Sequence, residues 1–254
     1  MKKLPISVFF VTLNESAYIA DAIKSVAACD EIIVVDCGST DGTQEIATKL
    51  GANVVHHPWQ GYAKQKQFAL ELCQHEWVLN LDGDEVMTED ALKELESVIN
   101  NPRYSSFRLK RIDMFIDKFP KESVKKKNNL RAYKKSLAFF NKQKKVHESA
   151  TVKGQEYYSK SHFYHFGYNN IDTLLDKINT YSSLRAQEKF ESGKAYSLAK
   201  LLFAFPVFFF KEYILGRLFL FGVRGFIKAM IGASYAFAKE AKLYEMHKKD
   251  KDKS

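Results

Sequence analysis

The sequence predicts an α/β protein with a mostly parallel sheet, followed by a helical C-terminal segment. Over roughly the first hundred residues, short apolar runs alternate with segments whose apolar residues recur at helical spacing. Strands separated by helices are typical of a parallel sheet covered by helices. The 254 residues are 46% hydrophobic and 27% charged, which excludes a disordered chain and is enough for one large domain or two small ones.

The strands and helices of this first part can be placed in order. The strands are expected at Ile6–Val11, Glu31–Asp36, Asn53–Val55 and Trp77–Asp82. The helices are expected around Ile19–Val26, Thr43–Leu50, Ala63–Cys73 and Leu92–Ile99. Ligands of such sheets bind beyond the carboxyl ends of the strands. The polar turns Thr12–Glu15, Asp36–Asp41 and Asp82–Glu85 are therefore the candidate site.

The remainder of the chain changes composition twice. Residues 101–160 hold 17 Lys and Arg against 5 Asp and Glu, a local charge of +12 that exceeds the +9 of the whole chain. A basic segment of this kind either holds an anionic ligand or is a solvated face. From Leu198 onward the chain is rich in Phe, Leu and Tyr with scattered cations, and it is expected to be helical.

Nothing in the sequence predicts secretion or a membrane span. The lysine-led N-terminus resembles a signal peptide, but Glu15, Asp21 and Lys24 interrupt its apolar core. No uncharged apolar run reaches the ~18 residues that a spanning helix needs, and the most apolar run, Leu201–Phe210, contains Pro206. Three cysteines without a CxxC pair argue against a disulfide scaffold or a zinc finger. We therefore expect a cytoplasmic protein.

The turn after the fourth strand carries two carboxylates separated by one glycine. Asp82 and Asp84 could converge on one hard cation, which prefers oxygen ligands and completes its shell with water and phosphate. The alternative is a solvated acidic turn that leads into a helix beginning at Thr88. The position at a strand end favours the metal interpretation.

The turn after the second strand is rich in small residues. Gly38 and Gly42 allow a ligand to approach the backbone closely, and the following helix N-terminus could receive an anion. Asp36, which ends the strand, could accept hydrogen bonds from a nucleoside. The alternative is a tight strand-to-helix connection capped by Ser39 or Asp41.

Taken together, three motifs resemble the nucleotide-sugar half of a family 2 glycosyltransferase with the GT-A fold, which is Rossmann-like. They are Val11–Glu15, Val35–Thr43 and Leu81–Glu85, in the order and spacing of that family. Gly61–Gln67 stands where the family has a glycine and then a basic residue followed by asparagine, and Gln67 departs from that asparagine.

The resemblance implies a UDP-sugar donor and a divalent metal, Mg²⁺ or Mn²⁺. The implied nucleotide-binding residues are Thr12, Glu15, Asp36, Lys66 and Asp82. The first three would contact the uracil side, Lys66 would lie near the nucleotide, and Asp82 would approach the ribose and the metal. Asp84 would bind the metal between the diphosphate oxygens, where the cation neutralises charge on the departing UDP.

The second half resembles the bacterial lipopolysaccharide core glucosyltransferases that modify inner-core heptose. The matching pieces are Asn129–Lys135, Lys145–Glu148, His165, Lys177–Ser182, Gly225–Ile227 and Tyr235–Phe237. The resemblance implies a nucleotide-sugar half over residues 1–105, an acceptor half over 106–195 and a C-terminal helical, amphipathic segment over 196–254.

Inverting sugar transfer requires a base that takes the proton of the acceptor hydroxyl. We nominate Glu148, which follows the metal motif, lies in the acceptor half and has His147 beside it. Asp113 and Asp117 are the alternatives, and Glu148 could instead be a surface carboxylate that balances nearby lysines. His147 and His165 could orient the substrate.

The basic segment suits an anionic acceptor. Arg131, Lys134 and Lys135, with Lys125–Lys127, could meet phosphates of lipid A and its inner core, or form a solvated face.

The C-terminal segment combines cations with aromatic bulk. Arg217, Arg224 and Lys228 are spaced for one helical face, among many phenylalanines between Leu198 and Phe237. This pattern suits a helix lying in the interface of an anionic leaflet. A helical hairpin packed on the sheet, or a dimer contact, is the alternative.

The sequence therefore favours a metal-dependent, inverting UDP-sugar glycosyltransferase, peripheral on the cytoplasmic face of the inner membrane. It would move a hexose, glucose by resemblance, to heptose of the lipopolysaccharide inner core. Another lipid-linked or polysaccharide acceptor is the nearest alternative. The net charge also fits a nucleic-acid-binding protein, but the basic residues lack interleaved aromatics and the acidic strand ends would repel phosphate, so no nucleic-acid partner is expected. Asp82, Asp84 and Glu148 argue against a non-catalytic scaffold.

Overall fold

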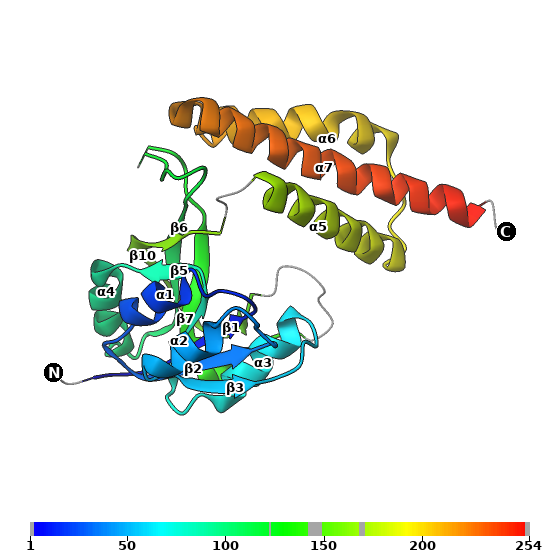
Figure 1. Cartoon of the computed structure of the whole chain (residues 1–254). Coiled ribbons are helices and arrows are strands. Elements are labelled where there is room, and N and C mark those ends of the chain that lie inside the picture. The colour runs from blue at the N-terminus through cyan, green and yellow to red at the C-terminus, as the bar shows by residue number, and fades with distance from the viewer. Residues whose placement is uncertain (1–2, 122, 142–148, 168–170, 252–254) are drawn as a thin grey trace. The chain divides into compact units, whose positions relative to one another are not determined.

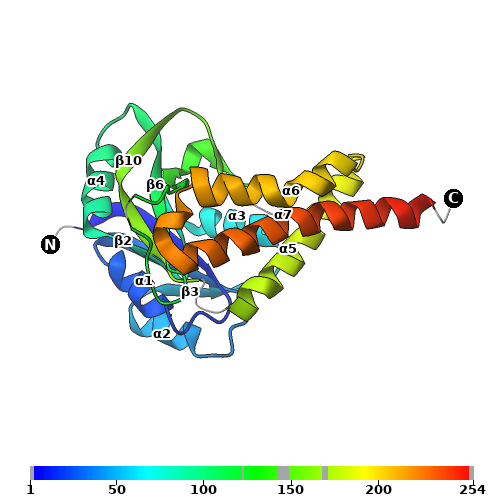
Figure 2. The same ribbon diagram turned by 90° about the horizontal axis from the view of Figure 1, so that it is seen from above.

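The computed structural model describes residues 3–121, 123–141, 149–167 and 171–251 of the chain (Figure 1). The chain forms two compact units. Unit 1 comprises Met1–Ile112 and Lys127–Gly167, and unit 2 comprises Asp113–Lys126 and Tyr168–Ser254. Unit 1 holds the main sheet with helices α1 to α4, and unit 2 holds helices α5 to α7 (Figure 1, Figure 2).

The main sheet of unit 1 has eight strands in the order β3-β2-β1-β4-β7-β6-β10-β5. The first four in chain order are β1 (Leu4–Thr12), β2 (Cys29–Asp36), β3 (Asn53–His56) and β4 (Trp77–Asp82), and they pair in parallel. The others are β5 (Glu85–Met87), β6 (Tyr104–Asp113), β7 (Asn128–Lys134) and β10 (Gln155–His165). β7 pairs antiparallel with β4 and β6, and β5 pairs antiparallel with β10. A separate two-stranded sheet joins β8 (Ala138–Phe139) and β9 (Thr151–Val152).

The parallel strands are apolar on both sides because helices cover both faces of the sheet. Successive side chains of a strand point to opposite faces, and in β1 Phe10 joins one core cluster while Phe9 joins the other. The first cluster contains residues of α1 (Ile19–Ser25), α2 (Thr43–Lys49) and α4 (Glu89–Ile99). The second contains residues of α3 (Tyr62–Leu72). Each predicted strand and helix is confirmed, with small differences at the ends.

Unit 2 is built on a long C-terminal helix. Its helices are α5 (Ile171–Glu191), α6 (Leu198–Phe210) and α7 (Gly222–Lys251). A π-helical turn, η2 (Lys211–Leu215), and a 3₁₀ turn, η3 (Leu218–Phe221), connect α6 to α7. α7 packs against both α5 and α6. The predicted helical C-terminal segment is confirmed.

A segment between β6 and β7 belongs to unit 2. Val124 packs with Leu218 and Ala229 in a small apolar cluster, and the Lys125 N–H donates to the Gly216 carbonyl at 3.1 Å. The Arg224 Nε donates to the Ile116 carbonyl at 2.9 Å. Residues 113–126 are therefore tied to the α6–α7 connection.

The prediction that Arg217, Arg224 and Lys228 share one helical face is wrong for Arg217. Arg217 has φ 59°, in the left-handed region, and precedes η3, while Gly222 with φ 62° separates η3 from the rest of α7. Helical spacing therefore cannot be extended across the connection. Arg224 and Lys228 do lie on α7.

One helical stretch in the described part of the chain is long and apolar enough to cross a membrane. It spans Leu218–Asp250, with a mean hydropathy of 1.3 in its best window. The expectation of no membrane span rested on uncharged apolar runs alone, and Arg224 and Lys228 interrupt this stretch. The core helix of a soluble protein can have the same length and composition, so the feature is weak evidence for a span.

Candidate active site

The candidate site lies where β1, β2 and β4 end side by side. Thr12 pairs with Asp36 across β1 and β2, and Val11 pairs with Asp82 across β1 and β4. The order of the strands reverses at β1, and ligands of open α/β sheets bind at such a point. The register therefore brings together the three turns that the sequence singled out.

Asp36 holds the turn after β2 in place. Its carboxylate is fully buried. One oxygen accepts hydrogen bonds from the backbone N–H groups of Gly38 and Ser39, at 2.9 and 2.8 Å, and from Gln44 Nε2 at 2.8 Å. The other oxygen accepts from Thr12 Oγ1 at 3.0 Å. Asp36 thus organises the turn itself, and its implied contact with the nucleoside stays a prediction.

The first two turns are bonded to each other. Asn14, with φ 57°, accepts from the Thr40 N–H at 2.9 Å, and the Glu15 N–H donates to Thr43 Oγ1 at 2.8 Å. Although burial acts to raise the pKa of Asp41, hydrogen bonds from Thr43 and Ser16 hold it well below its usual range. The connection from β2 to α2 is therefore held firmly by hydrogen bonds, which agrees with the alternative interpretation of this turn as a tight strand-to-helix connection.

Gly83 brings the third turn against the first. A Cβ placed on Gly83 would lie 2.9 Å from Cγ of Glu15 and 3.3 Å from Cγ2 of Thr12. Only glycine allows this approach, which explains the small residue between the two aspartates. Thr88 then caps α4 by accepting from the Ala91 N–H at 3.3 Å, so the predicted helix start is confirmed.

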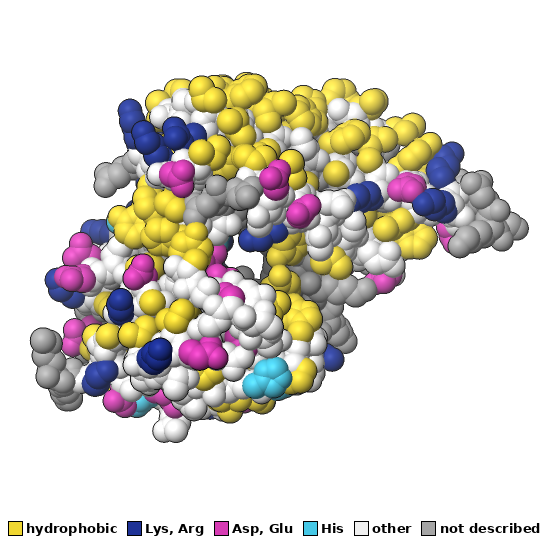
Figure 3. Space-filling model, in the orientation of Figure 1, with side chains coloured by type: hydrophobic (Ala, Val, Ile, Leu, Met, Phe, Trp, Pro, Cys, Tyr) yellow, Lys and Arg dark blue, Asp and Glu magenta, His cyan; other side chains and the backbone are white. Residues whose placement is uncertain are grey.

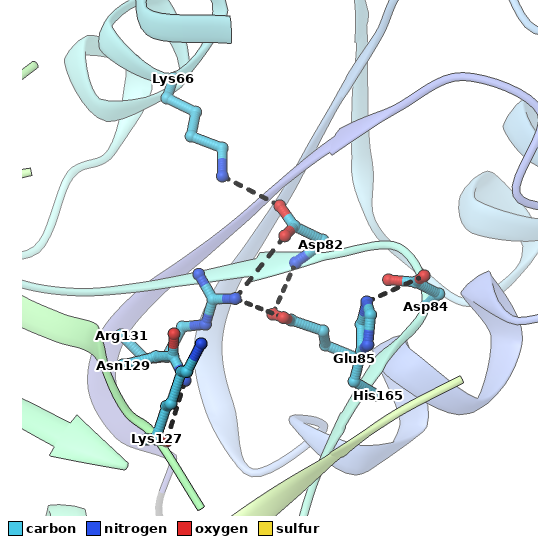
Figure 4. A network of polar contacts seen from close by, with 8 residues as sticks. All are labelled: Lys66, Asp82, Asp84, Glu85, Lys127, Asn129, Arg131 and His165. Carbon is cyan, nitrogen blue, oxygen red and sulfur yellow. Dashed lines mark hydrogen bonds and ion pairs between the residues drawn. The ribbon is translucent and has the colours of Figure 1, made fainter. Parts of the chain in front are cut away.

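A network of charged side chains surrounds Asp82 (Figure 4). Lys66 Nζ of α3 lies 3.0 Å from Asp82 Oδ1, and Arg131 Nη2 of β7 lies 3.6 Å from Asp82 Oδ2. Arg131 also bonds Glu85, which is fully buried. Glu85 Oε2 accepts from the Asp82 N–H at 3.1 Å. Two cations and a buried acid therefore fix the orientation of Asp82.

The charges of this network follow from its surroundings. Burial acts to raise the pKa of Asp82, but the Lys66 ammonium and the Arg131 guanidinium hold it well below its usual range. Burial raises the pKa of Glu85, and the neighbouring Arg131 opposes that shift. Asp82 is therefore ionised at neutral pH.

Asp84 faces a histidine at the end of β10, the strand that pairs with β5. His165 Nε2 lies 3.4 Å from Asp84 Oδ2, and both residues are buried. The Phe166 N–H donates to the Asp84 carbonyl at 3.0 Å. The backbone of Gly167 passes so close that a Cβ there would lie 3.0 Å from His165 Nε2 and closer still to Asp84. The end of β10 is thus fitted around the second aspartate.

The donor chemistry of this edge fits a divalent metal. The carboxylates of Asp82 and Asp84 are oxygen ligands of the kind that Mg²⁺ and Mn²⁺ prefer. Within the described ranges, no group of three or more His, Cys, Asp or Glu side chains is arranged to hold a metal ion, so the chain would supply two carboxylates at most. Substrate phosphates and water would complete the shell, as they commonly do for Mg²⁺. The buried Arg131 Nε has no hydrogen-bond partner among the described residues.

The basic residues predicted to meet an anionic acceptor have other partners. Arg131 is buried against Glu85 and Asp82. Lys135 Nζ donates to the carbonyls of Glu71 and Cys73 at 3.1 and 2.5 Å, where it caps the end of α3. Both side chains therefore have partners inside unit 1, and their contact with an anionic acceptor stays a prediction.

The nominated base, Glu148, and its neighbour His147 lie outside the described residues. Glu148 as the base stays a prediction. Of its alternatives, Asp113 lies in unit 2, where its Oδ2 is 3.2 Å from Lys228 Nζ. Sequence reasoning did not find the pairing of Glu85 with Arg131, because no local pattern links a turn to a strand so much later in the chain.

The similarity of this chain to known proteins extends over nearly its whole length. The sequence profile named Glycosyl transferase family 2 matches residues 7–161. The lipopolysaccharide core biosynthesis glycosyltransferase LpsC of Rhizobium meliloti is 37% identical, over 96% of this chain and 94% of LpsC. An uncharacterized glycosyltransferase of Rickettsia felis is also 37% identical, over 97% and 92% of the two chains.

Solved structures share the fold at lower identity. Residues 1–349 of S. aureus TarS align with a TM-score of 0.50 and 18% identity, over 95% of this chain and 89% of that one. The same protein in complex with UDP-GlcNAc aligns with a TM-score of 0.52 and 17% identity, over the same shares. Together with the matched motifs at the ends of β1, β2 and β4, these similarities show that the chain belongs to glycosyl transferase family 2 and has the GT-A fold.

Proposed function

We propose that this glycosyltransferase transfers a hexose, glucose in the first instance, from a UDP-sugar to a heptose of the lipopolysaccharide inner core. The observation that carries the proposal is the Asp82–Asp84 turn, with Lys66, Arg131 and His165 gathered around it at the strand ends. The name of LpsC, which matches almost the full chain, supports lipopolysaccharide core assembly as the setting.

The donor would lie across the ends of β1, β2 and β4. The TarS complexes with UDP and UDP-GlcNAc support a UDP-sugar. Thr12, Glu15 and Asp36 would receive the uracil side, and Lys66 would lie near the nucleotide. Asp82, held by its two cations, would approach the ribose and the metal.

Asp84, with Asp82, would hold Mg²⁺ or Mn²⁺, and His165 would orient Asp84. When bound, the cation supplies Lewis-acid stabilisation of the charge on the departing UDP. Lys66 and Arg131 would fix Asp82 for that role.

The transfer itself would invert the anomeric carbon. The acceptor hydroxyl oxygen bonds to C1 of the sugar while the bond from C1 to the phosphate oxygen breaks, and UDP leaves with that electron pair. Glu148 would take the proton of the hydroxyl as the new bond forms. Its position after the metal motif, within the family resemblance, supports this role.

The acceptor would be reached at the cytoplasmic face of the inner membrane, with the enzyme attached peripherally. The anionic lipid A and core match the local charge of +12 over residues 101–160.

The test is UDP release from a panel of UDP-sugars, with heptose-terminated lipopolysaccharide as acceptor and either Mg²⁺ or EDTA. Release with one donor, requiring acceptor and metal, is expected. Glu148→Gln should abolish transfer while UDP still binds, whereas Glu89→Gln, a change at a side chain 92% exposed on α4, should leave turnover normal. Transfer that survives both EDTA and Glu148→Gln would refute the mechanism, and failure of the folded enzyme to bind UDP would refute the donor.

A further inference from the structure

Unit 2 exposes a large apolar face along α6 and the turns that follow it (Figure 3). The exposed side chains on α6 and η2 recur at spacings of three and four: Phe203, Val207, Phe210 and Ile214. The face continues through Leu215, Phe219, Val223 and Phe226. Val223 is 76% and Leu215 is 62% exposed. Soluble monomers rarely leave so extended an apolar patch open to water, so the face has a partner.

Cations outnumber anions around this face. Residues 192–238 contain six Lys and Arg and one acidic residue, Glu212. The segment 113–126, which docks on the α6–α7 connection, adds the exposed Lys118, Lys121 and Lys125 and the exposed Asp117, and its sequence holds four Lys against three Asp and Glu. Lys125 is placed beside Gly216, and hence beside the exposed Leu215 and Arg217, by its backbone hydrogen bond.

This arrangement of charge selects among possible partners. In a two-fold contact with a second copy, the same surface meets itself, so the cations of the two chains would be brought face to face. An anionic bilayer surface neutralises those cations and accepts the apolar side chains between its headgroups.

The packing of α7 argues against a membrane-crossing arrangement. Lys189 of α5 bonds Glu240 of α7, and Lys242 Nζ donates to Ser182 and Asn179 of α5, at 2.8 Å in each case. Nearer the start of the helix, Arg224 Nε bonds the Ile116 carbonyl and Lys228 Nζ pairs with Asp113, so a spanning α7 would have to carry these polar partners into hydrocarbon.

We propose that the apolar face formed by α6, η2, η3 and the start of α7, together with Lys118, Lys121 and Lys125, is the surface by which the enzyme lies on an anionic lipid bilayer. The inference deepens the proposed function, on which it rests for the identity of the membrane. It assigns the docking surface to two separate chain segments that unit 2 brings together.

The experiment is co-sedimentation of the full chain with phosphatidylcholine vesicles, with or without phosphatidylglycerol, at low and high salt. Binding is expected only with phosphatidylglycerol and should weaken at high salt. Each lysine near an anionic surface contributes roughly a five-fold factor, so Lys121→Gln with Lys125→Gln should weaken binding roughly 25-fold. Leu215→Ser with Val223→Ser should weaken it at least roughly ten-fold, because two exposed apolar side chains no longer enter the interface.

Matched controls carry the same chemical changes elsewhere. Leu175→Ser replaces a 47% exposed leucine of α5, and Lys93→Gln replaces a 72% exposed lysine of α4. Both should bind vesicles as the unaltered protein does. All of these positions are exposed, and circular dichroism verifies that each variant folds.

Four results would overturn the proposal. Two concern the vesicles: equal binding to neutral and anionic vesicles, and normal binding by both double variants. The third is resistance of the bound protein to alkaline carbonate extraction, as expected of a spanning helix. The fourth is a dimer in solution that Leu215→Ser with Val223→Ser converts to monomers. Vesicle binding and UDP release are separate readouts. Binding without transfer from any donor would refute the proposed function alone, and transfer without vesicle binding would refute this inference alone.

Discussion

Removing the Arg131 guanidinium should destabilise unit 1 strongly, because it would leave the Glu85 carboxylate buried without its partner. Glu85 is fully buried and Arg131 is 8% exposed. Breaking a buried ion pair by removing one partner costs about 3–5 kcal/mol. Methionine keeps much of the apolar contact of Arg131 with Phe163, whose ring centre lies 5.2 Å from the guanidinium carbon. We therefore expect Arg131→Met to lower the free energy of unfolding by about 3 kcal/mol.

Urea unfolding, followed by the fluorescence of the buried Trp77, measures this loss. In the double variant Arg131→Met with Glu85→Gln the buried charge is gone, and more than half of the loss should be recovered. Arg108→Met is the matched control, since the Arg108–Glu156 pair is 28% and 30% exposed. It should cost about 1 kcal/mol or less.

The effect of pH gives an independent check. Burial already raises the pKa of Glu85, and the loss of Arg131 raises it further. A group with a raised pKa in the folded state stabilises that state at low pH, and the contribution is lost as pH rises through the folded pKa. The deficit of Arg131→Met should therefore shrink as pH falls toward the ordinary value of 4.5. A midpoint equal to that of the unaltered protein, or a deficit independent of pH, would refute the reasoning.

Three further predictions follow from unit 1. Asp84→Asn should weaken Mn²⁺ binding to the UDP complex at least roughly ten-fold in a calorimetric titration, and unchanged metal affinity would remove Asp84 from the metal site. Gly83→Ala should lower the free energy of unfolding in urea by about 1–3 kcal/mol, because the new Cβ would lie 2.9 Å from Glu15 Cγ. The same change should raise the KM for the donor. An unaltered KM would show that the turn can shift freely. Burial acts to raise the pKa of Glu94, but hydrogen bonds from Ser159 and its neighbours lower it to about 2. The ionised Glu94 therefore stabilises the folded state at pH values above its pKa in the unfolded chain, and this stabilisation is lost as pH falls toward 2. Glu94→Gln should therefore lose about 1 kcal/mol at neutral pH but little in acid, after allowance for solvent screening; equal losses in thermal melts at both pH values would contradict this.

The parallel half of the fold was predictable because its signals are local. Each strand from β1 to β4 is a short apolar run between turn residues, and each helix has its own apolar spacing. The meeting of Thr12, Asp36 and Asp82 then follows from the rule that parallel strands present their carboxyl ends at one edge.

The remaining site residues depend on pairings that no local pattern contains. His165 reaches Asp84 because β10 pairs antiparallel with β5, with His165 opposite Glu85. Arg131 reaches Glu85 because β7 pairs with β4. β6 reads as Tyr-Ser-Ser-Phe-Arg-Leu-Lys-Arg-Ile-Asp, and its frequent polar residues hide a strand whose Phe107 and Leu109 are fully buried in the core. Arg131 and His165 can be seen in the sequence, but the residues that they contact cannot be deduced from it.

Residues 113–126 belong to unit 2 although they connect two strands of unit 1, and this limits where the protein can be divided. The chain changes unit after Ile112, after Lys126 and after Gly167. Cutting it at Gly167 would remove α5 to α7 but leave Phe115 and Val124, both nearly fully buried, without the helices that cover them. A fragment shortened in this way would expose the apolar side chains of residues 113–126 and tend to aggregate. Replacing that segment with a tight turn between β6 and β7 would avoid this. Helices α5 to α7 and residues 113–126 should therefore be kept or removed together when the protein is divided.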